Sequence, residues 1–312
     1  MSIRDRVAII GVGATQFGEH FEQGYSDLIV EAAYEAFRDA NVSPPQIQAA
    51  WLGTCFPDSG GYQGNAGASL ADALSLYHAP ISRVANYCAT GADAFRNACF
   101  AVAAGAYDLV LVVGAEKMRD VTARESLVGQ LAETGHPVHG KGVTAPGMFA
   151  LFATRYFDRF GIGRETLAKV AMKNHRHGSL NPKAHFQKEI TLEQYFKAPM
   201  VADPLGLYDC CPQTDGAAAA VICRADLAPT FSKEPILVKG LGLANPVGDG
   251  LAFDPDSDFI SFRATKEAAT QAYEQAGVKD PFKEIDVAEL HDCFTITELV
   301  TYEDLGFCQK GE

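Results

Sequence analysis

Basic residues are scarce in this sequence. Its 312 residues include 26 Lys and Arg against 39 Asp and Glu, which gives a formal net charge of -13. Because binding to a nucleic-acid polymer needs a concentrated basic surface, so acidic a chain is a poor candidate for that partner. A small anionic ligand remains compatible with the composition, since a few local Lys and Arg side chains suffice to bind it.

Long hydrophobic runs are missing as well. No apolar stretch is long and uncharged enough to span a bilayer. The apolar run within residues 1–13 is too short for a signal peptide, and no small-residue cleavage pattern follows it. We therefore expect a cytoplasmic protein that has no membrane segment.

Metal-binding cysteine patterns are also absent. None of the eight cysteines belongs to a CxxC pair, and Cys210 and Cys211 are adjacent, which is not a metal-ligand spacing. Most of the cysteines lie in apolar runs, which favours reduced, buried thiols over a disulfide framework. We expect no bound metal.

One stretch of the sequence occurs twice. Residues 31–42 align without a gap with residues 267–278, and both read as helices that stop at Asn or Gly. A strand ending in Gly-x-Gly precedes each helix, and an apolar strand, 47–52 or 285–290, follows it. Because the strands recur in the same order, the pattern indicates a duplicated unit.

The first copy continues beyond its second strand. A strand at 83–87, an apolar helix at 90–105 and a strand at 107–114 follow, and strands that alternate with helices predict a mainly parallel sheet covered on both faces. A long irregular excursion over 117–213 comes next, with an amphipathic stretch near 148–160, before the chain returns to an apolar strand at 217–223. Insertions of this size usually form or cover a site.

Cys88 is the first candidate catalytic residue. It follows a strand expected to be buried, and Thr90 and Asp93 behind it have the spacing of a capping box. A helix N-terminus favours the thiolate, which is the form that attacks carbonyl carbons. The alternative is a small core side chain, because most buried cysteines are inert.

A second polar cluster, His291 to Phe294, stands at the end of the strand 285–290. In open α/β sheets, ligands bind outside the carboxyl ends of the strands. His291 and Cys293 there can supply an oxyanion donor and a proton shuttle. The alternative is a buried His satisfied by Asp292, beside a cysteine that only packs. Since the two clusters end equivalent strands of the repeat, we expect them to share a pocket.

Five motifs occur in an order that resembles the thiolase superfamily, in particular the sterol-carrier-protein-type thiolases and their bacterial and archaeal relatives. The motifs are Asn86 to Gly91, Val112 to Met118, Met172 to Gly178, Thr214 to Ala219 and His291 to Phe294. The resemblance covers essentially the whole chain. It implies an α/β protein with a thiolase-like duplicated βαβ fold, in which mixed sheets are layered with helices and a large loop domain is inserted.

The resemblance also implies a division into domains. Residues 1–116 with 214–230 correspond to the N-terminal thiolase half, and residues 117–213 to the loop domain that covers coenzyme A. Residues 231–312 correspond to an incomplete C-terminal half. A homodimer is expected because the family forms one, and a coenzyme A thioester is expected as substrate, with no permanently bound cofactor.

Residue roles follow from the same resemblance. Cys88 matches the nucleophile that accepts the acyl group. His291 matches the residue that, with a water molecule, forms the oxyanion hole for the enolate of the second acyl-CoA. Cys293 matches the general acid and base that moves the α-proton. His175 and His177, in a segment read as a polar loop, are interpreted as solvated or coenzyme A-contacting residues rather than metal ligands.

One family element is not found in its usual order. Members carry a Gly-His-Pro motif beyond the His-Asp-Cys-Phe motif, and its His activates the nucleophile. Here Gly135 to Pro137 lies inside the excursion, and we interpret it as a coincidence. We therefore expect the 312-residue chain to be part of a longer protein or to need another chain, and to be inactive or impaired as a thiolase by itself.

These observations predict an acyl-CoA acyltransferase that condenses or thiolytically cleaves 3-ketoacyl-CoA through an acyl-Cys88 intermediate. One alternative is a thiolase-like retro-aldolase that works with an OB-fold partner. Another is a non-catalytic acyl-CoA-binding subunit. The presence of both Cys88 and Cys293 favours acyl transfer, because a retro-aldol cleavage needs no acyl-enzyme.

Overall fold

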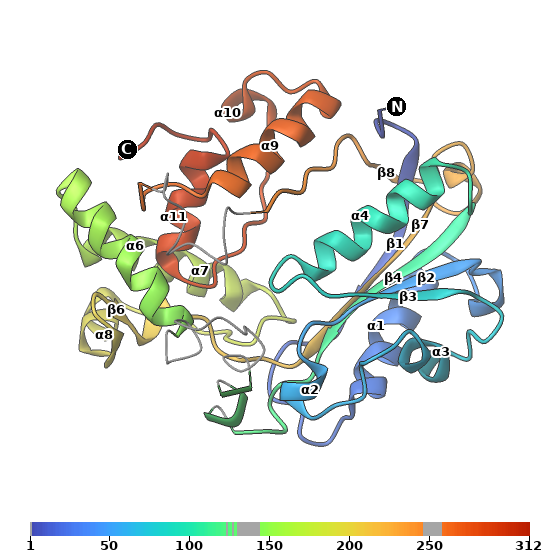
Figure 1. Cartoon of the computed structure of the whole chain (residues 1–312), viewed down its shortest axis with the longest axis horizontal. Coiled ribbons are helices and arrows are strands. Elements are labelled where there is room, and N and C mark those ends of the chain that lie inside the picture. The colour runs from blue at the N-terminus through green and yellow to red at the C-terminus, as the bar shows by residue number, and fades with distance from the viewer. Residues whose placement is uncertain (1, 123, 127, 130–143, 246–257) are drawn as a thin grey trace. The chain divides into compact units, whose positions relative to one another are not determined.

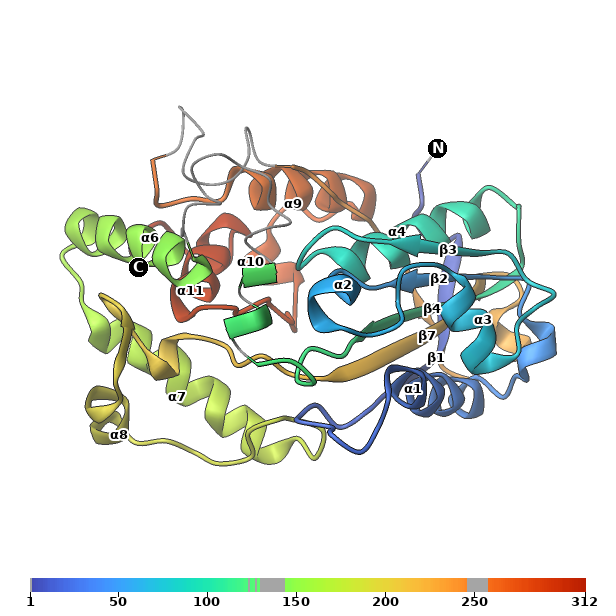
Figure 2. The same cartoon turned by 60° about the horizontal axis from the view of Figure 1, so that its bottom comes forward.

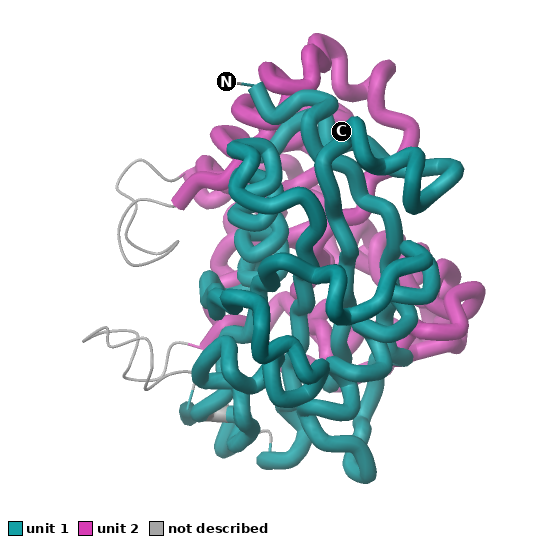
Figure 3. The backbone as a smooth tube through the Cα atoms, turned by 90° about the vertical axis from the view of Figure 1, so that its right-hand side faces the viewer, with its two compact units in different colours: residues 1–130, 213–241 teal, residues 131–212, 242–312 magenta. Residues whose placement is uncertain are grey.

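The computed structural model describes residues 2–122, 124–126, 128–129, 144–245 and 258–312 (Figure 1). Its contacts divide the chain into two compact units (Figure 3). Unit 1 comprises residues 1–130 and 213–241, and unit 2 comprises residues 131–212 and 242–312. None of the helices in the described part of the chain combines the length and the apolar character that crossing a bilayer requires.

Unit 1 is built on a six-stranded sheet with the strand order β3-β2-β4-β7-β1-β8. The strands are β1 (Val7–Ala14), β2 (Ala49–Gly53), β3 (Ile81–Val84), β4 (Leu109–Glu116), β7 (Gly216–Arg224) and β8 (Ile236–Leu237). The predicted strands of the first copy and the strand after the excursion are thus confirmed, with ends that shift by a few residues.

The sheet is mixed, which confirms what the family resemblance implies, whereas the mainly parallel sheet expected from the alternation of strands and helices was wrong. β2 runs parallel to β3 and β4, whereas β7 runs antiparallel to both β4 and β1. The reason is that the chain leaves the sheet at the end of β4 and returns at the same edge. β7 is therefore not joined to β4 by a βαβ crossover, which would have made the two strands parallel.

Helices cover both faces of this sheet, as predicted. α1 (Tyr25–Asp39) and α3 (Ala68–Leu74) pack against side chains such as Leu111 and Val113, while α4 (Thr90–Ala103) packs against their neighbours Val110 and Val112. Figure 2 shows α1 and α4 on opposite sides of the sheet. Alternate residues of β4 thus enter two different cores, which explains its unbroken apolar sequence. The remaining short elements of unit 1 are η1 (Pro44–Gln46), α2 (Pro57–Gly60) and η4 (Ala228–Thr230).

A close contact between backbone and helix recurs in both copies of the repeat, although in the second copy the predicted strand before the helix is formed only at β8 and Gly242 lies beyond it. A Cβ atom on Gly13 would overlap the carbonyl oxygen of Ala32 in α1, and a Cβ atom on Gly242 would overlap the carbonyl oxygen of Ala268 in α9 (Arg263–Ala276). The sequence repeat aligns Ala32 with Ala268. The second glycine of each Gly-x-Gly is therefore needed for the same close approach of backbone to helix.

Unit 2 is mostly helical in its described part. Its elements are α6 (Ala145–Phe160), α7 (Arg164–Leu180), α8 (Leu192–Lys197), β5 (Met200–Ala202), β6 (Leu205–Gly206), η3 (Leu207–Asp209), α9, α10 (Pro281–Glu284) and α11 (Thr295–Asp304). One core includes side chains from α6, α7 and α11. The excursion over 117–213 is less irregular than expected. Its amphipathic stretch near 148–160 is confirmed as part of α6, whereas α7 was missed, because only its first half carries a buried stripe and its polar second half did not read as helix.

The strand predicted at 285–290 is not formed. These residues carry no strand assignment, and the Val287 side chain is 80% exposed. The segment reads as a strand because it is rich in apolar residues and follows its helix as 47–52 does in the first copy, but a strand also needs a partner with which to exchange backbone hydrogen bonds. In the described part of unit 2, strand pairing is limited to the antiparallel ribbon of β5 and β6.

Candidate active site

Cys88 lies in a tight turn between β3 and α4. Tyr87 before it has φ 44, a left-handed conformation that is unfavourable for a bulky residue. The Thr90 hydroxyl locks the turn, since it donates to the Tyr87 carbonyl at 2.6 Å and accepts from the Asn86 N–H at 2.7 Å. The surrounding bonds therefore hold the Cys88 backbone in one conformation.

Two details of this turn differ from the prediction. β3 is an edge strand and only partly buried, and Cys88 itself is exposed. The capping box is not formed, because the Thr90 hydroxyl makes its hydrogen bonds within the turn. The N-cap of α4 is Ala89, which has no side-chain hydrogen-bonding group. The strand-turn-helix placement of the thiol is confirmed.

The electrostatics of Cys88 also differ from the expectation based on a helix N-terminus. Although one side of the residue is open to solvent, loss of hydration on the protein side raises the pKa of the thiol, and the backbone N–H of Cys88 offsets this only in part. Desolvation disfavours the thiolate, and it outweighs the hydrogen bond here. At neutral pH this thiol therefore needs a base to remove its proton.

Two neighbours of this turn were missed by sequence reasoning. The Cys55 thiol lies beside this turn: burial raises its pKa, and the Thr90 side chain and the backbone of Tyr87 act in the opposite direction. Glu116, the last residue of β4, accepts hydrogen bonds from the Cys55 N–H at 2.5 Å and from the Tyr62 hydroxyl. Burial raises the pKa of the Glu116 carboxyl, although these donors and Arg83 act in the opposite direction. The sequence signal that could have revealed Glu116 is an acidic residue at the end of a predicted buried strand.

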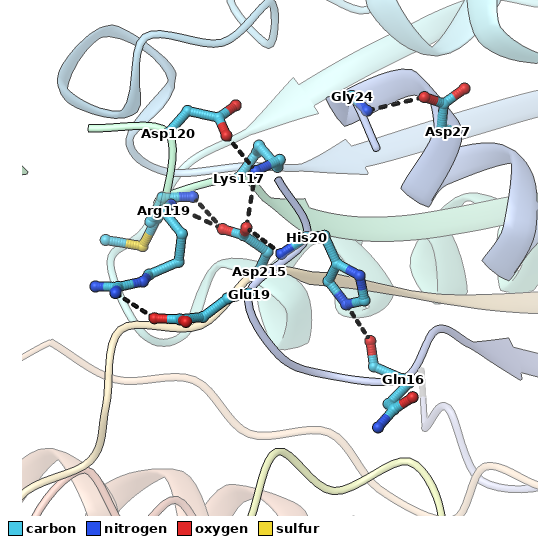
Figure 4. Close-up of polar contacts among 10 residues, drawn as sticks. Gln16, Glu19, His20, Gly24, Asp27, Lys117, Arg119, Asp120 and Asp215 are labelled. Atoms are coloured by element: carbon cyan, nitrogen blue, oxygen red, sulfur yellow. Dashed lines mark hydrogen bonds and ion pairs between the residues drawn. The ribbon is translucent and has the colours of Figure 1, made fainter. Parts of the chain in front are cut away.

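A buried ion pair stands at the ends of the inserted segment. Lys117, just after β4, contacts Asp215, just before β7, and it also contacts Asp120 (Figure 4). The Asp215 carboxylate further accepts from the backbone N–H groups of Met118 at 2.7 Å and His20 at 3.2 Å. The pair thus joins three chain segments of unit 1 at the edge of the sheet where β4 ends.

His291 and Cys293 belong to a turn that leads into α11 of unit 2. The Cys293 carbonyl accepts from the Cys211 N–H at 3.0 Å, and its sulfur lies 3.4 Å from the Thr297 hydroxyl. Phe294 is the N-cap, and it makes no side-chain bond. The sequence places Thr295 and Glu298 at the spacing of a capping box, and this expectation was wrong.

The Thr295 hydroxyl is used differently. It donates to the buried Asp209 at 2.7 Å, and Asp209 also accepts from Tyr195. Residues 209–211, from the inserted segment, therefore hold the turn of the C-terminal segment. Desolvation lowers the pKa of His291, although the charge of Asp292 acts in the opposite direction. His291 is thus neutral at pH 7, with one ring N–H available to donate.

The remaining candidates are placed as follows. His175 and His177 lie on α7, so the expected polar loop was wrong there. The expectation of reduced, buried thiols was only partly right: none of the eight cysteines, all of which lie in the described ranges, forms a disulfide, but only Cys99 and Cys223 are buried. No group of three or more His, Cys, Asp or Glu side chains in the described ranges is arranged to hold a metal ion. Residues 135–137, with the Gly-His-Pro sequence, lie outside the described residues.

The structure brings His291 and Cys293 together in one turn of unit 2, while Cys88 belongs to unit 1. The pocket expected to be shared by these three residues therefore stays a prediction.

Comparisons with known proteins give a consistent result. The family model for the thiolase N-terminal domain matches residues 7–226, and the one described as thiolase C-terminal domain-like matches residues 249–312. An acetyl-CoA acetyltransferase of Methanothermobacter thermautotrophicus is 37% identical, over 98% of this chain and 78% of its own length. Sterol carrier protein 2 of Gallus gallus is 32% identical, over 98% of this chain and 57% of its own length.

A solved structure is similar over nearly the whole chain. The structure named Ltp2-ChsH2(DUF35) aldolase has a TM-score of 0.82 and 26% sequence identity, and the match covers 99% of this chain and 79% of that one. The similarity includes both units, since only a small part of the chain lies outside the match.

Proposed function

The chain belongs to the thiolase family, and we propose that it is an acyl-CoA acyltransferase that forms or cleaves 3-ketoacyl-CoA through an acyl thioester on Cys88. The observation that carries this proposal is the Cys88 turn. It presents an exposed thiol from a strained, hydrogen-bonded backbone at the start of a helix. A nucleophile held in this way attacks without having to reorganise its backbone.

The first half-reaction uses unit 1. A base removes the proton from Cys88, and the thiolate attacks the carbonyl carbon of an acyl-CoA. The tetrahedral intermediate then collapses, the carbon-sulfur bond to coenzyme A breaks, and coenzyme A leaves as a thiolate that takes up a proton. The product is the acyl-Cys88 thioester. The raised pKa of Cys88 makes the base necessary.

The second half-reaction uses the turn of unit 2. Cys293, as thiolate, removes an α-proton from a second acyl-CoA, and the neutral His291 N–H with a water molecule stabilises the enolate oxygen. The enolate carbon attacks acyl-Cys88 and expels the Cys88 thiolate, which yields 3-ketoacyl-CoA. In thiolysis the same steps run in reverse. Desolvation lowers the pKa of His291 and so keeps its ring neutral, with one N–H to donate to the enolate oxygen.

The proposal extends to substrate and assembly. Coenzyme A thioesters are substrates, with no permanently bound cofactor. Residues 1–116 with 214–230 form the N-terminal thiolase half, residues 231–312 belong to the C-terminal half, and residues 117–213 form the loop domain that covers coenzyme A. The family assignment supports the thioester substrate. A homodimer in the cytoplasm completes the proposal.

A second candidate is a thiolase-like retro-aldolase, or a non-catalytic acyl-CoA-binding subunit, that works with an OB-fold partner. The observation that favours it is the similarity to a structure named an aldolase, at a TM-score of 0.82. A retro-aldol reaction breaks the bond between the α- and β-carbons of a 3-hydroxyacyl-CoA and needs no acyl-enzyme. Cys88 would then be dispensable.

Intact-mass spectrometry separates these functions. The full-length protein, purified from its native cells, is incubated with acetyl-CoA or acetoacetyl-CoA. A mass increase of one acetyl group is expected on Cys88. Cys88→Ala should lose the adduct and the turnover, whereas Cys308→Ala, which removes another partly exposed thiol, should retain both. Binding of coenzyme A without an adduct would favour the binding subunit. Cleavage of a 3-hydroxyacyl-CoA by Cys88→Ala would favour the aldolase.

A further inference from the structure

The Asn174 side chain bridges two carboxylates in unit 2. Its Nδ2 atom donates to Asp292 Oδ2 at 2.6 Å and to Glu298 Oε2 at 2.6 Å. Asn174 lies on α7, Glu298 lies on α11, and Asp292 lies between His291 and Cys293 in the turn. One amide group therefore ties this turn to two helices at once.

The orientation of this amide is fixed by chemistry. Ionised carboxylates only accept hydrogen bonds, and the amide nitrogen carries two hydrogens. Both hydrogens of Asn174 are therefore used, one on each carboxylate, and an amide rotated by half a turn would place its oxygen against two acceptors. Hydrogen bonds to ionised partners are also stronger than hydrogen bonds between two neutral groups. The bridge thus also offsets the repulsion between Asp292 and Glu298.

Glu298 anchors the bridge to the core of unit 2. Its side chain is almost completely buried, and it also accepts from the Lys173 ammonium and the Tyr302 hydroxyl. Lys173 donates to the same Tyr302 hydroxyl at 2.7 Å. A carboxylate with this many donors is held in one position. Asn174 transmits that fixed position to Asp292, which is exposed and has no such anchor of its own.

We propose that Asn174 is a positioning residue that holds the Asp292 carboxylate on Glu298, and thereby fixes the orientation of His291 and Cys293 for the transfer of the α-proton. This inference rests on the function proposed above. It assigns Asn174 to one of the two half-reactions only. Acylation of Cys88 depends on the unit 1 turn, so it should be independent of Asn174.

The expected effects separate the two half-reactions. With Asn174→Ala, the exchange of acetyl-CoA α-protons with D2O, followed by NMR, should fall about 100-fold, which is typical when catalytic groups lose their alignment. The kcat of acetoacetyl-CoA cleavage should fall in parallel, while KM stays nearly constant. The acetyl adduct on Cys88 should form as in the wild type.

Three further variants make the test specific. Asn174→Gln keeps both N–H donors on a longer side chain and should restore part of the exchange rate. Asn174→Asp removes both donors and adds a third carboxylate, so it should be at least as impaired as Asn174→Ala. Asn65→Ala is the matched control, because Asn65 is an exposed amide of unit 1, lies outside residues 117–213, and donates to the Asp58 carboxylate at 3.1 Å. It should leave both half-reactions unchanged.

Each outcome decides between the proposals. Unchanged proton exchange in Asn174→Ala, or equal losses of exchange and of Cys88 acetylation, would overturn the positioning role while the proposed function stands. If Asn174→Ala does not fold, the comparison of Asn174→Gln with wild type decides in the same way. A wild-type protein that forms no Cys88 adduct would overturn the proposed function itself, and with it this inference.

Discussion

Lys117 Nζ lies 2.8 Å from Asp215 Oδ2, with the two side chains only 1% and 0% exposed (Figure 4). Lys117 is the residue at which the chain leaves the sheet of unit 1, and Asp215 is the residue by which it returns. Because the pair is buried, its attraction is weakly screened, and the loss of one partner leaves a charge without compensation. The pair therefore links the two ends of the inserted segment, where the chain leaves the sheet of unit 1 and where it returns.

Replacing Lys117 by Met should destabilise unit 1 by about 3 kcal/mol, since Asp215 then remains buried and loses its ammonium partner. Urea unfolding followed by the fluorescence of Trp51, the only tryptophan and a residue of β2, reports on this unit. Lys239→Ala is the control, because it breaks the exposed pair with Asp5 and should cost less than about 1 kcal/mol. Equal effects of the two substitutions would contradict a structural role for the buried pair.

The same pair predicts a loss of stability in acid. Burial alone would raise the pKa of Asp215, but Lys117 and the backbone N–H groups of His20 and Arg119 outweigh it and hold the pKa below its ordinary value. A carboxyl group whose pKa is lower in the folded state contributes stability above its unfolded pKa of about 4, and this contribution is lost as the pH falls through the folded pKa.

The matched experiment compares wild type with Asp215→Asn from pH 6 downwards, again by the fluorescence of Trp51. The variant should be less stable at pH 6 and should lose less stability on acidification, because Asn does not titrate. Parallel pH profiles for the two proteins would show that other carboxyl groups cause the acid sensitivity.

The sequence predicts the elements whose pattern is local. β4 reads as a strand because alternate residues enter two cores, and α1 and α9 were recognised as copies because the contacts of Gly13 and Gly242 impose the same small residues on both. The turn at Cys88 was placed correctly for a similar reason, since a strand, a turn and a helix follow each other within a few residues.

Long-range partners were not predictable from local pattern. Thr90 and Thr295 both have the spacing of an N-cap, yet one hydroxyl locks the Cys88 turn and the other binds Asp209, which is 86 residues away in the sequence. The segment 285–290 is apolar and follows its helix as a strand of the first copy does, but no local signal tells whether a partner strand is available. The role of Asn174 likewise depends on its hydrogen bonds to Asp292 and Glu298, which lie more than a hundred residues away along the chain.

The Tyr62 hydroxyl gives a prediction for the surroundings of Cys88. It donates to the partly buried Glu116 carboxylate, whose other oxygen accepts from the Cys55 N–H, and the Cys55 thiol lies beside the turn that carries Cys88. Tyr62→Phe removes one donor from a partly buried carboxylate, so it should destabilise unit 1 by about 1–3 kcal/mol. Because the Cys55 segment is then held less firmly, the rate of alkylation of Cys88 by iodoacetamide should also change.

Tyr77→Phe is the matched control for this effect. Its hydroxyl belongs to a side chain that is 72% exposed, so removing it should change neither the Trp51 unfolding curve nor the alkylation rate. Peptide mapping after a short exposure to iodoacetamide measures Cys88 separately from the other seven cysteines. If Tyr62→Phe lowers stability but leaves the alkylation rate of Cys88 unchanged, Glu116 stabilises unit 1 without influencing the nucleophile. A changed rate would connect the end of β4 to the reactivity of Cys88.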